Sequence, residues 1–88
     1  RETFALFEYG KAEILLGKLE EGLATLDGVL QIIAEDEPKD FEFILDIETR
    51  MVVVMRALGR IEEANEVERR LVAVREALAD VEIQPLGN

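Results

Sequence analysis

Carboxylates are the residues of this chain best suited to do chemistry, and they gather in two places. Glu62, Glu63 and Glu66 fall within one turn of an expected helix, and a second group lies at residues 35–40, which read Glu-Asp-Glu-Pro-Lys-Asp. Such oxygen ligands suit a hard cation, and two carboxylates across a cleft suit the acid and base of a glycosidase. Neither pattern is complete, because a calcium loop needs a central glycine among alternating acids and a di-iron bundle needs histidine. We interpret both groups as solvated surface and expect no metal site.

Other reactive side chains are scarce, which argues against an enzyme. The chain has no cysteine, histidine, serine or tryptophan. A hydroxyl nucleophile would have to be Thr3, Thr25 or Thr49, with no imidazole to activate it. Thiol chemistry and disulfides are absent as well. We expect a protein without catalytic activity and without a cofactor.

Charge narrows the class of partner. Twenty acidic and ten basic residues give a net charge of −10 over 88 residues, which repels nucleic-acid phosphates and anionic lipid headgroups. The longest apolar run, Met51–Met55, has five residues, far fewer than the roughly 20 that a membrane-spanning helix needs. We expect a cytoplasmic protein that binds neither nucleic acid nor membrane. The acidity is either a solvated surface or, since seven of the ten basic residues are Arg, an adaptation to salt.

A repeated phrase indicates how the chain is organised. Residues 17–22 read Gly-Lys-Leu-Glu-Glu-Gly, and residues 59–64, which begin 42 positions later, read Gly-Arg-Ile-Glu-Glu-Ala. Repeats of this length are usually pairs of helices that bury their apolar faces against neighbouring pairs. In each copy the first glycine suits the end of one helix, and the two acidic residues suit the first turn of the next.

Apolar spacings of three and four predict four helices, at 3–16, 19–34, 38–58 and 61–80. The stripe of the first helix consists of Ala5, Tyr9, Ala12 and Leu16. Pro38 suits the first position of the third helix. Gly22 and Gly28 in the second helix mark either a close helix crossing or a tolerated exposed site. Residues 52–54, all valine, could form a strand by propensity, but the helical spacing on both sides favours a helix.

The predicted fold is therefore all-α, with two stacked antiparallel helical hairpins. We expect one domain over residues 1–82, in which the first hairpin covers about 3–37 and the second about 38–80. Residues 83–88, with a proline and a glycine, are expected to be a flexible tail.

This pattern resembles the tetratricopeptide repeat, in the longer-repeat variety found in kinesin light chains. In the first copy Tyr9 and Gly10 take the place of the family's large-small pair, Gly17 occupies the turn, and Gly22 takes the small position where the two helices touch. The second copy departs from the template where Val52 replaces that small residue. Glu68 departs from it too, because it falls where a large apolar side chain is usual.

The resemblance implies a non-catalytic scaffold that holds a peptide or helix of a partner protein in a groove lined by the first and third helices. The positions that match this groove are Phe7, Lys11, Ile14, Arg50, Val53 and Arg56. Cations among apolar walls suit a ligand that offers a carboxylate. Two alternatives stay open: Arg56 could pair instead with Glu63 or Asp46, and Phe7 and Val53 could belong to the core. The family's motif for chaperone tails is not matched, because Phe7 and Lys11 replace its Lys and Asn.

A second function also remains open. The last helix spreads apolar residues beyond a narrow stripe, at Val72, Val74, Leu78 and Val81. Such a face is expected when a helix is covered by another repeat or another copy of the chain. The alternative is therefore a self-associating piece of a longer helical-repeat array, which includes a homodimer.

Overall fold

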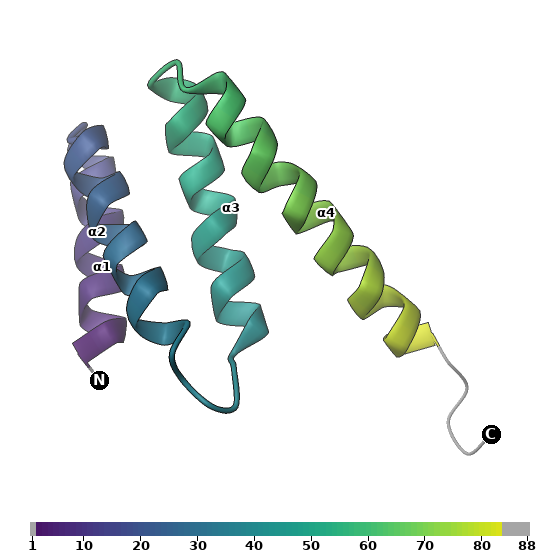
Figure 1. Cartoon of the computed structure of the whole chain (residues 1–88). Helices are drawn as coiled ribbons and strands as arrows, with labels where there is room; N and C mark the ends of the chain where they lie inside the picture. Colours follow the sequence, from purple (N-terminus) through teal and green to yellow (C-terminus); the bar gives the residue numbers. More distant parts are fainter. Residues whose placement is uncertain (1, 84–88) are drawn as a thin grey trace.

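The computed structural model describes residues 2–83, with side chains described for residues 2–80. Over this range the chain forms four helices and no strand: α1 (Glu2–Leu15), α2 (Leu19–Ile33), α3 (Phe41–Ala57) and α4 (Ile61–Ile83). α1 and α2 form one antiparallel hairpin, α3 and α4 form a second, and α2 packs against α3 (Figure 1). The predicted all-α fold of helical hairpins is confirmed. The valine run lies inside α3, so a strand there is wrong.

The two copies of the repeated phrase form the same turn. Gly17 and Gly59 have φ angles of +83° and +79°, in the left-handed region that glycine adopts without steric cost. In each turn the glycine N–H donates to the carbonyl three residues back, and the following N–H donates to the carbonyl five residues back, at 2.8–3.1 Å. This pair of bonds is a Schellman motif, which satisfies carbonyls left open at a helix end. Equal sequence thus produces equal geometry in both hairpins.

Both turns lie at the same end of the molecule (Figure 1), and one ion pair joins them. Arg60 Nη2 of the second turn donates to Glu20 Oε1 at the start of α2, at 2.6 Å. Both side chains are partly exposed, so the pair is worth at most about 1 kcal/mol. Its contribution is to align one hairpin with the other.

Small residues let α1 and α2 approach closely. A Cβ at Gly22 would lie 2.6 Å from Ile14 Cγ1 and 3.1 Å from the carbonyl oxygen of Gly10, and Gly10 itself faces Leu26. Gly22 therefore marks a close helix crossing. Gly28 has no atom within 4 Å of its would-be Cβ and is a tolerated open site.

The link between the hairpins corrects one sequence prediction. α3 begins at Phe41, not at Pro38, because Asp40 is the N-cap residue and its carboxylate accepts a hydrogen bond from the Phe43 N–H at 3.1 Å. An Asp at this position satisfies an N–H group that the helix itself leaves open. At the other end of the link, Lys39 Nζ donates to the Ala34 carbonyl at 2.7 Å, so the last turn of α2 is also satisfied.

The core is formed mainly by α2, α3 and the first half of α4, with Phe7 from α1. Its fully buried large side chains are Leu26, Val29, Ile47 and Leu71. The buried residues of α4 all precede residue 72, and the later part of the helix leans away from α3 (Figure 1). α4 continues to Ile83, three residues past its predicted end, and residues 84–88 of the predicted tail lie outside the described range. None of the described helices is both long and apolar enough to cross a membrane.

Candidate functional site

A hollow of about 490 Å³ opens between α1 and α3, the two helices from which the sequence predicts a groove. Its walls are mainly apolar. The lining residues are Glu8, Lys11, Ala12, Ile14 and Leu15 from α1, and Arg50, Val53 and Val54 from α3. Leu15 and Val53 are 87% and 64% exposed, so a ligand at this site could contact large apolar side chains directly.

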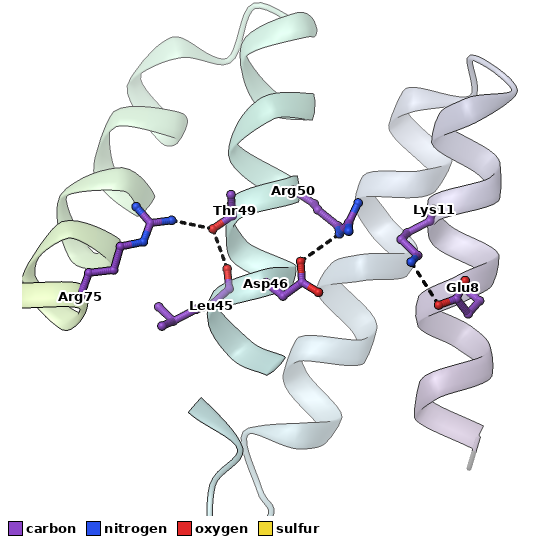
Figure 2. Close-up of polar contacts among 7 residues, drawn as sticks. All are labelled: Glu8, Lys11, Leu45, Asp46, Thr49, Arg50 and Arg75. Atoms are coloured by element: carbon purple, nitrogen blue, oxygen red, sulfur yellow. Dashed lines mark hydrogen bonds and ion pairs between the residues drawn. The ribbon is translucent and has the colours of Figure 1, made fainter. Parts of the chain in front are cut away.

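Each helix contributes one cation to the rim of the hollow, and each cation is held by an acid on its own helix. Lys11 Nζ lies 3.1 Å from a carboxylate oxygen of Glu8, and Arg50 Nε donates to Asp46 Oδ1 at 3.0 Å (Figure 2). These spacings of three and four residues bring side chains together on one helix face. The rim is therefore close to charge balance. Because an ammonium has three N–H groups and a guanidinium five, both cations keep donors for a ligand oxygen.

Phe7 lies beneath this rim. The Lys11 ammonium is 4.7 Å from the centre of the Phe7 ring, and the Arg50 guanidinium carbon is 5.6 Å from it. The ring also meets Phe43 of α3 edge to face, with centroids 5.1 Å apart. At 3% exposure, Phe7 belongs to the core and holds α1 against α3, while its face attracts the two cations.

The structure brings together four of the six residues predicted for the groove: Lys11, Ile14, Arg50 and Val53. Phe7 supports the site from below. Arg56 lies on the α4 side of α3, where it forms an ion pair with Glu68. Neither acid suggested as an alternative partner for Arg56 has that role, since Asp46 pairs with Arg50 and Glu63 with Arg60.

Sequence reasoning missed four of the lining residues: Glu8, Ala12, Leu15 and Val54. Glu8 could have been found from its spacing, because an acid three residues before Lys11 is a common helical ion pair. Leu15 could not, since it belongs to an apolar run in which no spacing separates a core position from an exposed one.

The opposite side of α3 is occupied by contacts with α4. Arg75 Nη2 donates to Thr49 Oγ1 at 2.9 Å, and Thr49 in turn donates to the Leu45 carbonyl at 2.7 Å (Figure 2). Arg70 lies 3.7 Å from Glu48, whose side chain is only 12% exposed. These contacts fix the face of α3 that turns toward α1, and so they orient Arg50 and Val53 at the hollow.

The acidic groups noted in the sequence show no ligand cluster. Among the described residues no three Asp or Glu side chains come together as candidate metal ligands. Several of these acids pair with cations, as Glu63 and Glu66 do with Arg60 and Arg69.

Comparison with protein-family models, curated proteins and solved structures finds no match. The tetratricopeptide resemblance therefore rests on the repeated phrase, the small residues at the helix crossing and the helix order. Membership of that family stays a prediction. The hollow between α1 and α3, by contrast, is observed in the structure.

Proposed function

We propose that this chain is a tetratricopeptide-like interaction module, without catalytic activity, that holds a helical or extended segment of another protein in the hollow between α1 and α3. The observation that carries the proposal is the chemistry of the hollow. Exposed Leu15 and Val53 offer apolar contact, and Lys11 and Arg50 offer charged donors on opposite walls.

The two walls suggest the chemistry of the ligand. Apolar side chains of the segment would cover Leu15, Ile14 and Val53, which gains free energy in proportion to the apolar area removed from water. Since Glu8 and Asp46 already balance the two cations, a ligand carboxylate adds a contact but does not supply most of the affinity. A mainly apolar segment with one acidic group fits best.

The test compares two exposed valines on different helices. Peptides are selected from a displayed library on the wild-type chain, and binding of each is then measured for Val53→Glu and for the control Val72→Glu. We expect Val53→Glu to weaken binding about tenfold or more, since a charge would be desolvated at the contact, while circular dichroism stays unchanged.

Val72 lies on α4, is 45% exposed and does not line the hollow, so Val72→Glu should leave binding intact. If Val53→Glu binds the selected peptides as tightly as wild type, the ligand does not occupy this hollow.

A further inference from the structure

The repeat allows each residue of α1 to be compared with its equivalent on α3, 42 positions later. The four apolar residues whose spacing predicts α1 each have an apolar equivalent on α3. The equivalent pairs are Ala5 with Ile47, Tyr9 with Met51, Ala12 with Val54, and Leu16 with Leu58. We name the four α1 residues the α1 stripe.

Equivalent residues have opposite surroundings in the two hairpins. Ile47, Met51 and Val54 are 0%, 5% and 3% exposed. In the α1 stripe, by contrast, Tyr9 is 61% and Leu16 is 74% exposed, and both alanines are exposed as well. Burial of these residues therefore depends on whether a neighbouring helix covers them, and not on their position in the repeat.

The element that covers this face of α3 is α2. The contacts of Thr49 and Arg56 mark the side of α3 that faces α4, and Phe43 and Arg50 mark the side that faces α1. By helical spacing, Ile47 lies between these two sides, where α3 packs against α2. The α1 stripe thus has the position of a face that receives the second helix of a preceding hairpin.

The face of α4 at the other end of the stack is more polar, although Val72 and Val74 are 45% and 36% exposed. α2, which contacts α3, contributes Leu23, Leu26 and Leu30 to the core or its edge, and 42 positions later α4 carries Asn65, Glu68 and Val72. Those three residues and Arg69 line one shallow hollow on α4, and Glu68 is paired with Arg56. Three of these four lining residues are polar or charged, and terminal repeats of helical stacks have polar outer faces. The departure of Glu68 from the repeat template is explained by this position.

We propose that the helical stack is closed at α4 and open at α1, and that the α1 stripe receives one further hairpin of the same kind, through a second helix with the leucine spacing of α2. The four stripe positions carry no charge in a chain of net charge −10, so the contact brings no additional like charges together at its centre. The stripe shares Ala12 with the hollow between α1 and α3, whereas Ala5, Tyr9 and Leu16 do not line that hollow.

The test duplicates residues 1–42 ahead of Arg1, which keeps the 42-residue period and the Asp40 cap. The chain has one tyrosine and no tryptophan, so Tyr9 fluorescence reports directly on the stripe when the added copy carries Tyr9→Phe. We expect acrylamide quenching of Tyr9 to fall by about half or more as the ring becomes buried. The midpoint of thermal unfolding, Tm, should rise by about 5 °C or more.

Leu16→Lys, made on the stripe of the original segment, supplies the control. In the duplicated chain it should abolish both the protection of Tyr9 and the gain in Tm. In the chain without the added copy it should change Tm by less than about 1 °C, because Leu16 is exposed there.

Two results would overturn the proposal. One is an equal quenching of Tyr9 with and without the added hairpin. The other is a dimer of the original chain, measured by light scattering, that Leu16→Lys dissociates, because the stripe would then belong to a second copy. Val53→Glu should affect neither measurement, which separates failure here from failure of the peptide site.

Discussion

Gly22 and Gly28 lie on the same helix and have opposite surroundings. A Cβ at Gly22 would meet the Gly10 carbonyl oxygen and the Ile14 side chain across the helix crossing, whereas a Cβ at Gly28 would meet open space. Glycine lowers helix stability at both positions because of its conformational freedom. At Gly22 this loss is offset, because the absence of a side chain lets α1 and α2 pack closely. At Gly28 nothing offsets it.

Alanine at the two positions should therefore act in opposite directions. Gly22→Ala should lower the free energy of unfolding by about 1–3 kcal/mol, since the Ile14 side chain must move and the Gly10 carbonyl blocks the new methyl group. Gly28→Ala should raise it by about 0.5–1 kcal/mol. Urea denaturation followed by circular dichroism measures both, and a stabilised Gly22→Ala would contradict the close crossing.

At the candidate site, spacing and charge could be read from the sequence, whereas burial and packing between helices could not. Lys11 and Arg50 lie at the hollow because solvated cations must lie on an outer helix face. For Phe7 and Arg56 the sequence left two alternatives open, the groove or, respectively, the core and an ion pair. Phe7 is buried, and Arg56 instead meets an acid of α4, a contact that depends on how α4 packs.

The helices show which boundary signals can be read from sequence. The two glycine turns were predictable, because a left-handed residue at a helix end leaves glycine as the best choice. The start of α3 was not, because Pro38 and Asp40 both suit a helix start and only the hydrogen bond to Phe43 decides between them. The end of α4 was also missed, because no glycine follows Asp80 directly to mark a helix end.

Loss of the Asp40 cap should destabilise the second hairpin. Asp40→Ala removes the acceptor for the Phe43 N–H and should lower the free energy of unfolding by about 1 kcal/mol, which corresponds to a fall in Tm of about 4–8 °C for a chain of this size. Asp40→Asn keeps an acceptor oxygen and should lose much less. Calorimetry distinguishes the two, and equal losses would show that charge, not the cap, is responsible.

At the scale of the molecule, stability should be graded from the centre toward the ends of the stack. α2 and α3 are packed on both sides, whereas α1 has one exposed apolar face and α4 loses its buried contacts after Leu71. Beyond that residue, the described tertiary contacts of α4 include the Arg75 bond to Thr49 and a hollow in which Ala73 and Val74 face Phe41 and Leu45. Neither buries much apolar surface, so the last turns of α4 depend on helix propensity.

Amide hydrogen exchange should resolve this gradient. Amides between Ala64 and Leu71 should exchange only with unfolding of the whole chain, because their side chains lie in the core. Amides of residues 76–80 should exchange at least about 100-fold faster, since an unsupported helical segment of a few turns is marginal in water. Uniform protection along α4 would mean that something covers its second half in solution, and the closed end of the stack would then have to be sought elsewhere.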